Sequence, residues 1–466
     1  MKRLIASLLT LSLLGFGITS AQADDPSAGS SGMGDRYFPS DGNGGYDVQH
    51  YDVAHRVGVG GGSLTGRTTF QAHSLQALNR FNVDIMLKVN SVKVDGVPAG
   101  FTKESAHELV ITPATPIPDD TDFAVEVRYS GKPSTLSWKG ERPFLRTTGE
   151  MMAMNEPQIA PWWFAANDHP RDKATIDVRI TVGNGYEGIS NGRLTQVVKG
   201  KRWTAWQWRS AEPMAPYLAF FAAGDFAFER GMHKEIPTFN AVSKKLSKTQ
   251  QKRSLALLRR TPRVIAWLET WLGPYPFTAI GGVTTAIRTG FALENQTRPT
   301  YPYAGGAEGD WLVAHEIAHQ WFGDKVSVNN WRDVWLNEGL ATYFETLWSD
   351  NYGFTSPQQW LRFSWESYES DDSFWRVRLA DPGPRNMFHE AVYERGAMTI
   401  QALRHRIGTT DFKKLMRAWV KGRDHGSTED FVALAEEVSG EDLTSFFDAW
   451  VRSTTRPART AANGLN

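Results

Sequence analysis

One stretch of the sequence restricts the possible folds more than any other, because it holds two histidines and two acids at fixed distances. It reads "VAHEIAHQWFGDKVSVNNWRDVWLNEGLATYFE" and runs from Val313 to Glu345. His315 and His319 are four residues apart in a helical pattern, so their side chains share one face, about one turn apart. Glu316 projects from an adjacent direction. Glu338 follows nineteen residues after His319, in the first turns of a second predicted helix.

Two imidazoles and one carboxylate are the ligand set of a catalytic zinc site, in which the fourth position is left for water. We therefore predict that His315, His319 and Glu338 bind one Zn²⁺ per chain. Glu316, beside the metal, is suited to act as a base on the metal-bound water. The alternative is a solvated helix face, which the added "WLNEGLATYFE" at this separation disfavours.

The helix of Glu338 carries two more polar side chains on the same face, Thr342 and Glu345. Either is a candidate for orienting a metal ligand from outside the coordination shell.

The first 23 residues are typical of a secretory signal peptide. A basic start at Lys2 and Arg3 precedes the apolar run "LIASLLTLSLLGFGI", and "AQA" precedes Asp24. We expect cleavage after Ala23 and a secreted, extracellular protein with no membrane anchor; an uncleaved anchor is the alternative. No cysteine is present, which excludes disulfides and a lipoprotein anchor. Lys plus Arg equals Asp plus Glu, at 51 each, so we expect no nucleic-acid partner.

The remaining chain divides into segments of different pattern. Residues 24–45 are rich in Gly and Ser and predict a flexible leader. Residues 46–229 contain alternating stretches such as "RFNVDIMLKVNSVKVDG" and predict an antiparallel all-β domain. Residues 230–455 are mostly helical with a small sheet between Phe277 and Thr300, and predict an α+β domain. Residues 456–466 form a C-terminal tail.

The metal motif and "WLNEG" together resemble the zinc aminopeptidases related to aminopeptidase N, a group of gluzincin metallopeptidases. Three other stretches agree with that family: "FALENQTRPTY" from Phe291, "VYERGAMTIQALR" from Val392, and "EPQIAPWWFAANDHPRDKAT" from Glu156. The resemblance covers roughly Tyr46 to Val451. It implies a thermolysin-like fold for the catalytic domain.

The resemblance also implies roles for individual residues. It makes His315, His319 and Glu338 the zinc ligands and Glu316 the general base and acid. Tyr393 would then stabilise the oxyanion of the tetrahedral intermediate. Three further residues would bind substrate, with the two acids at the free α-amine: Ala292, Glu294 and Glu156.

Two features depart from the family pattern. Phe291 and Leu293 stand where the family usually has Gly and Met, so backbone contacts to the peptide are expected to differ. The chain also stops soon after "FDAWVRSTTRPART", where many relatives continue into a large helical domain. The closed chamber of those relatives, and its limit on substrate size, are therefore not carried over.

Three functions remain open at this point. The first is a secreted zinc aminopeptidase acting on peptides with a free N-terminus. The second is a zinc endopeptidase that uses the same metal site, against which Glu294 and Glu156 argue. The third is a non-enzymatic protein with a polymer-binding β-domain and a relic metal site, against which Glu316, Glu338 and Tyr393 argue. The sequence does not fix the oligomeric state.

Overall fold

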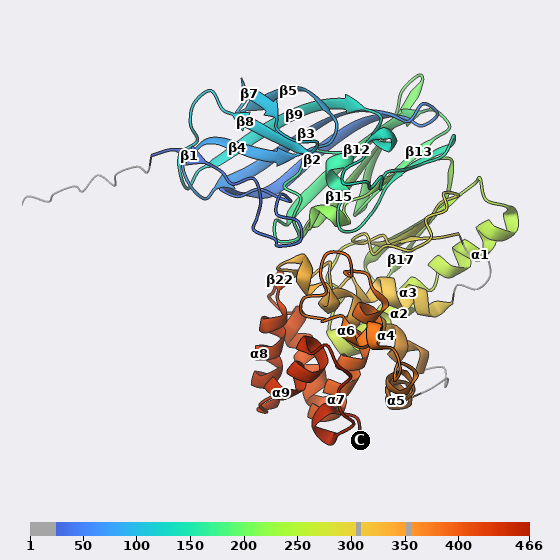
Figure 1. Cartoon of the computed structure of the whole chain (residues 1–466). Coiled ribbons are helices and arrows are strands. Elements are labelled where there is room, and N and C mark those ends of the chain that lie inside the picture. Colours follow the sequence, from blue (N-terminus) through green and yellow to red (C-terminus); the bar gives the residue numbers. More distant parts are fainter. Residues whose placement is uncertain (1–24, 304–308, 351–355) are drawn as a thin grey trace, which may run out of the picture.

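The computed structural model describes residues 25–303, 309–350 and 356–466 (Figure 1). The predicted signal peptide lies outside these residues. The fold class is confirmed: a β-rich N-terminal domain is followed by a mostly helical domain with a small sheet. In the described part of the chain, no helix is both long enough and apolar enough to span a bilayer.

The N-terminal domain is built from one large and two smaller sheets. The large sheet has the strand order β14-β15-β12-β2-β3-β9-β5-β6, and the smaller ones have the orders β1-β4-β8-β7 and β10-β11-β16-β13. Alternate residues of the long strands are buried, as the period-two pattern predicts. Two pairings are parallel, β2 with β12 in the large sheet and β1 with β4 in a smaller one. The strands are β1 Ser27–Ala28, β2 Tyr46–Gly58, β3 Ser63–Ser74, β4 Leu78–Asp84, β5 Lys88–Val94, β6 Val97–Pro98, β7 Gly100–Lys103, β8 Glu108–Thr112, β9 Asp122–Gly131, β10 Leu145–Arg146, β11 Glu150–Ala153, β12 Ala174–Gly183, β13 Glu187–Ser190, β14 Arg193–Lys199, β15 Trp203–Met214 and β16 Phe221–Gly224.

The second domain begins with a four-stranded sheet, in the order β17-β18-β19-β20, against which the first helices pack. Its first strand crosses the boundary expected between residues 229 and 230. The remaining helices form the lower part of the molecule in Figure 1. The strands are β17 Phe226–His233, β18 Ile236–Ser243, β19 Ile280–Thr284, β20 Thr300–Tyr301, β21 Ser327–Val328 and β22 His425–Gly426. The helices are α1 Lys248–Leu258, α2 Thr261–Leu272, α3 Asp310–Ala318, α4 Trp335–Asp350, α5 Pro357–Ser367, α6 Asp372–Arg376, α7 Glu390–Val420, α8 Thr428–Ser439 and α9 Thr444–Phe447.

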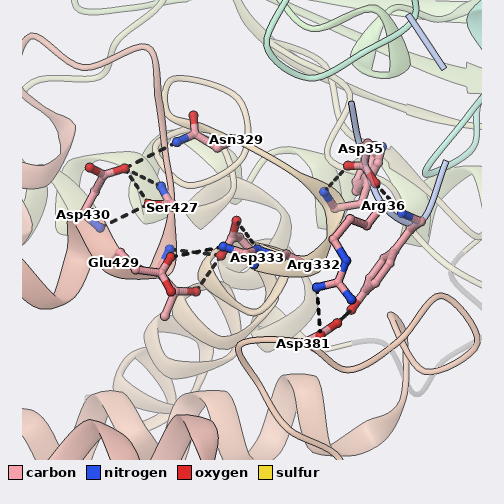
Figure 2. Close-up of polar contacts among 12 residues, drawn as sticks. Asp35, Arg36, Asn329, Arg332, Asp333, Asp381, Ser427, Glu429 and Asp430 are labelled. Carbon is pink, nitrogen blue, oxygen red and sulfur yellow. Dashed lines mark hydrogen bonds and ion pairs between the residues drawn. The ribbon is translucent and has the colours of Figure 1, made fainter. Parts of the chain in front are cut away.

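The segment 24–45 is not a flexible leader, and that prediction is wrong for its described part. Strand β1, Ser27–Ala28, pairs with β4, and the chain that follows runs between the two domains. Asp35 lies 3.6 Å from His169 of the β-domain and accepts a hydrogen bond of 2.7 Å from the backbone N–H of Trp331 in the helical domain (Figure 2). Tyr37 donates to Asp381 at 2.5 Å. These long-range contacts outweigh the flexibility that Gly and Ser confer.

The C-terminal tail, residues 456–466, also packs against the helical domain. Leu465 is buried, and the indole N–H of Trp450 donates to the carbonyl of Asn463 at 3.1 Å. The tail is therefore part of the domain that precedes it.

Candidate functional site

Helix α3 carries the two histidines. Its last α-helical residue is Ala318, and His319 follows with φ −56° and ψ −25°, so it continues the helical path for one more position. The Nε2 atoms of His315 and His319 lie 3.1 Å apart, as expected for residues one turn apart on one face. Glu338 lies in the first turn of α4, and its Oε2 is 3.5 Å from Nε2 of His315 and 3.4 Å from Nε2 of His319.

The other nitrogen of each histidine is held by a second residue. Nδ1 of His315 lies 3.0 Å from Oε2 of Glu345, and Nδ1 of His319 lies 3.1 Å from the carbonyl oxygen of Phe322. Both partners are acceptors, so each Nδ1 carries a proton and each Nε2, once deprotonated, can present a lone pair toward Glu338. Against the effect of burial, the carboxylate of Glu338 raises the pKa of both histidines, and a metal ion that replaces their Nε2 protons would find two imidazoles and a carboxylate, a donor set that fits zinc.

The prediction that Glu345 or Thr342 orients a ligand agrees with the geometry only for Glu345. The hydroxyl of Thr342 is buried and has no hydrogen-bond partner among residues 25–303, 309–350 and 356–466.

Burial and neighbouring charge shift the pKa values of the acids here. Burial by itself would raise the pKa of Glu338, but His319 and His315 lower it to about 2, so this ligand stays ionised. Burial raises the pKa of Glu316 to about 8, and the two histidines oppose that shift. Glu316 is therefore a carboxyl group that can both accept and release a proton near neutral pH.

Tyr393 reaches the site from the first turn of α7, and its ring stacks on that of His315 at 6.2 Å between centroids. Two glycines bring α4 and α7 close enough for this. A Cβ atom built on Gly396 would lie 2.7 Å from Cα of Gly339, so the backbones touch where the helices cross. Since Gly339 follows Glu338 directly, the crossing fixes the distance between metal ligand and tyrosine.

Glu294 follows a short connection after β19, and its loop is held by Gln320 just beyond α3. The amide of Gln320 donates to the carbonyl of Glu294 at 2.8 Å. Glu156 approaches from the β-domain. Each of the two acids has a buried Oε1 without a hydrogen-bond partner within the described chain. Burial raises the pKa of both, and each faces the negative charge of Glu338 as well.

A cleft of about 760 Å³ joins these residues, and every sequence-predicted site residue lines it, Ala292 included. The wall also contains residues that the sequence patterns did not single out: Asn155, Trp311, Leu312, Phe388, Glu390 and Glu394. Helical spacing could have found four of them, because Trp311 and Leu312 lie one turn before His315 on α3, and Glu390 and Glu394 lie on α7 beside Tyr393. Asn155 and Phe388 lie outside the helices and carry no such signal. Of the two departures from the family pattern, Phe291 is 44% exposed, whereas Leu293 is buried and pairs with Thr300 through its backbone.

Comparison with known families matches both halves of the chain. The peptidase family M1 domain matches residues 282–450, and the peptidase M1 N-terminal domain matches residues 49–218. Among proteins of known name, the chain is 25% identical to aminopeptidase M1-A of Oryza sativa subsp. japonica, over 88% of this chain and 50% of that one. It is 24% identical to aminopeptidase N of Lactococcus lactis subsp. lactis, over 80% of this chain and 47% of that one.

Solved structures agree with this match over the full length of the neighbour. The M1 zinc metallopeptidase from Deinococcus radiodurans is 26% identical, with a TM-score of 0.83, covering 92% of this chain and 99% of that one. A mutant of that enzyme was crystallised with a Tyr-Ser-Ala substrate. The chain spans about half the length of the named relatives above and nearly the whole of this structure.

Proposed function

The chain belongs to peptidase family M1, and on that basis we propose that it is a secreted zinc aminopeptidase that hydrolyses the first peptide bond of peptides. The observation that carries the proposal is the pair of acids, Glu156 and Glu294, each with an unpartnered buried oxygen in the cleft of the histidines. A free α-amine is largely cationic near neutral pH, since its reference pKa is about 7.7–8.0. It would supply the charge and the N–H donors that both carboxylates lack.

We propose one zinc per chain, held by His315, His319 and Glu338. When bound there, zinc would polarise the scissile carbonyl and lower the pKa of a water molecule. Glu345 and the carbonyl of Phe322 keep both imidazoles in the tautomer that ligation needs.

The residues around the metal ligands have separate roles in proton transfer, oxyanion stabilisation and binding of the substrate amine. Glu316 takes a proton from the attacking water and returns it to the leaving amine, a task that suits a carboxyl pKa near neutrality. The Tyr393 hydroxyl has no hydrogen-bond partner among the described residues, so it is free to donate to the oxyanion. Glu294 and Glu156 pair with the amine and fix the register, so that the first peptide bond lies over the metal ligands.

Secretion rests on the N-terminal sequence alone. A basic start, an apolar run and small residues at Ala21 and Ala23 support export of the chain and removal of its first 23 residues. Mass spectrometry of the N-terminus of exported protein tests this directly, and a mature chain that begins at Met1 contradicts it.

The test of the aminopeptidase proposal separates charge from bulk at the substrate N-terminus. Three matched peptides are compared: one with a free amine, one with an N-acetyl group, and one that lacks the amine. We expect kcat/KM to be at least about tenfold higher for the free peptide than for either other peptide, or roughly 1.4 kcal/mol. Replacing the amine by hydrogen adds no bulk, so it isolates the lost ion pair.

Variants assign the effect to the cleft. Glu294→Gln keeps the size of the side chain and removes its charge, so it should lose most of the preference for the free amine. Glu429→Gln is the matched control, because Glu429 is exposed and pairs with Arg332 outside the cleft. Equal cleavage of all three peptides by the wild type would exclude an aminopeptidase and favour the endopeptidase. No cleavage by zinc-loaded protein would favour the non-enzymatic function.

A further inference from the structure

A second group of buried acids lies in the β-domain, outside the cleft. Asp84 is the last residue of β4 and Glu108 is the first of β8, and the register of the two strands places them directly opposite each other. Their exposed fractions are 0% and 5%. Like charges at directly opposed positions destabilise a sheet, and burial increases that cost. A compensating group is therefore needed at this position.

His107 lies between the two acids. Its Nε2 is 3.7 Å from Oδ1 of Asp84 and 3.7 Å from Oε2 of Glu108, and one ligand atom from each residue lies within 4.8 Å of the others. A tetrahedral site with metal–ligand bonds of about 2.0–2.1 Å has ligands about 3.4 Å apart. The predicted catalytic ligands of the same chain are separated by 3.1–3.5 Å. The two distances from His107 in the second cluster, 3.7 Å each, are slightly longer.

Each carboxylate has one oxygen fixed and the other directed at His107. The backbone N–H of Asp168 and the amide of Asn43 donate to Oδ2 of Asp84, at 2.9 and 3.1 Å. The amide of Asn82 donates to Oε1 of Glu108 at 2.7 Å. Oδ1 of Asp84 is buried and accepts no hydrogen bond in the described chain. Carboxylates anchored through one oxygen and open at the other are typical of metal ligands with an outer shell of hydrogen bonds.

Neither tautomer of His107 satisfies this group. If the proton is on Nε2, it goes to the carbonyl of Ser40, 2.9 Å away, and the two carboxylate oxygens at 3.7 Å receive no donor. If the proton is on Nδ1, 3.3 Å from the hydroxyl of Ser105, then a lone pair on Nε2 faces three oxygens. The second arrangement needs either a metal cation or a proton shared by the acids among these four atoms.

The surrounding positive charge compensates the acids only in part. The Lys103 ammonium interacts electrostatically with Asp84 and Glu108, but it donates its hydrogen bonds to the carbonyls of Ile85 and Ala106 and forms no ion pair with either acid in the described chain. Burial raises the pKa of Asp84, and two further buried carboxyl groups, Asp41 and Asp168, lie close enough to raise it further; burial raises their own pKa values as well. Burial raises the pKa of Glu108 to about 7, which agrees with an incompletely compensated group of acids.

We propose that Asp84, His107 and Glu108 form a second metal site, which binds a transition-metal dication of the Zn²⁺ or Mn²⁺ type, with the carbonyl of Ser40 as a fourth ligand. The imidazole excludes Ca²⁺ and Mg²⁺ as the preferred ions, since those take oxygen ligands. The site is structural, because Asp84, His107 and Glu108 are all buried. It ties the β4–β8 pair to the segment 24–45, to which Ser40 belongs.

The test counts zinc in the full chain after chelator treatment and reloading, by calorimetric titration and by elemental analysis after gel filtration. Wild type should bind two equivalents of Zn²⁺. His315→Ala with His319→Ala removes the catalytic pair and should leave one equivalent. Asp84→Asn with Glu108→Gln, which preserves shape, should also leave one. Asp52→Asn with Glu126→Gln is the matched control from the β-domain surface and should bind two.

One equivalent in the wild type, together with none in the His315/His319 double variant, would overturn the proposal. It would indicate that the two acids share a proton, and Asp84→Asn with Glu108→Gln would then raise the melting temperature of metal-free protein near neutral pH. If that variant does not fold, the His315/His319 double variant decides by itself. There, Zn²⁺ should raise the melting temperature and a hundredfold excess of Ca²⁺ should not, whereas no effect of Zn²⁺ contradicts the site. Because this readout needs no substrate, it is independent of the proposed aminopeptidase activity.

Discussion

The crossing of α4 and α7 predicts that a single methyl group, introduced by Gly396→Ala, will impair turnover much more than stability. The new Cβ would lie 2.7 Å from Cα of Gly339, about 0.7 Å short of the 3.4 Å at which ordinary contact begins. The obstacle is backbone on both sides, so the helices themselves must move apart. Tyr393 is one turn before the substituted residue, and Glu338 directly precedes Gly339. The distance between Tyr393 and Glu338 therefore increases when the two helices move apart.

The magnitudes follow from that displacement. A misplacement of about 1 Å costs on the order of a hundredfold in rate, so a shift of about 0.7 Å should lower kcat by roughly 10- to 100-fold. Overpacking costs about 1–3 kcal/mol, but alanine gains about 1 kcal/mol over glycine inside a helix. The net loss of unfolding free energy is therefore at most about 2 kcal/mol, and the variant stays folded at 25 °C.

The assay measures kcat on a chromogenic aminoacyl amide, the unfolding free energy in urea, and the zinc content of the same samples. Gly183→Ala is the control, because its Cβ would meet nothing within 4 Å and its φ is not left-handed. A Gly396→Ala variant with kcat within twofold of wild type would refute the argument. So would a large loss of stability with full activity per folded molecule, since the glycines would then serve packing alone.

Three further outcomes are expected. Glu316→Gln should keep the zinc content and lower kcat by about 10²–10⁴-fold, since it removes the proton acceptor and leaves the ligands intact. Tyr393→Phe should lower kcat, with an activation free energy higher by roughly 2.7–4 kcal/mol, and should change KM little, because the hydroxyl acts on charge that develops only in the transition state. An unchanged kcat would assign the tyrosine to packing. Burial raises the pKa of Asp333 from 3.8 to about 6, despite two hydrogen bonds from Thr428. A carboxyl group with a raised pKa contributes stability below about pH 4, and this contribution is lost as the pH passes 6. The unfolding free energy of Asp333→Asn, measured in urea, should therefore rise by up to about 3 kcal/mol relative to that of wild type between pH 4 and pH 7. A difference that stays constant with pH would contradict this.

The metal-site residues were predictable because their chemistry is encoded locally. An i, i+4 histidine pair needs only a helix to converge, and α3 provides it for His315 and His319. Glu345 was a candidate for the same reason, since it shares a helix face with Glu338. The two domains were likewise predictable, because apolar residues recur with a period of two before β17 and with a helical period after it.

The errors came from segments whose structure depends on distant partners. The composition of residues 24–45 predicts flexibility, yet Asp35 and Tyr37 bond to residues nearly 300 or more positions away. The acids Asp84 and Glu108 are 24 residues apart, and only the β4–β8 register reveals that they are opposed. Likewise, the meeting of Gly339 and Gly396 cannot be inferred from spacing, because nothing in either helix specifies the other.

The path of the segment 24–45 affects how the chain can be shortened. The two family matches cover residues 49–218 and 282–450, so neither of them includes Asp35 or Tyr37. A protein trimmed to the matched region would keep every predicted zinc ligand and both acids that we propose to bind the amine. It would lose the contacts that join Trp331 and Asp381 to the β-domain (Figure 2). Direct contacts between the β-domain and the loop of Glu294 would remain, such as the hydrogen bonds that Arg298 donates to the carbonyls of Ser190 and Gly192. The trimmed protein should therefore keep Glu156 near Glu294, while Trp331 and Asp381 lose the contacts that hold their side of the domain boundary.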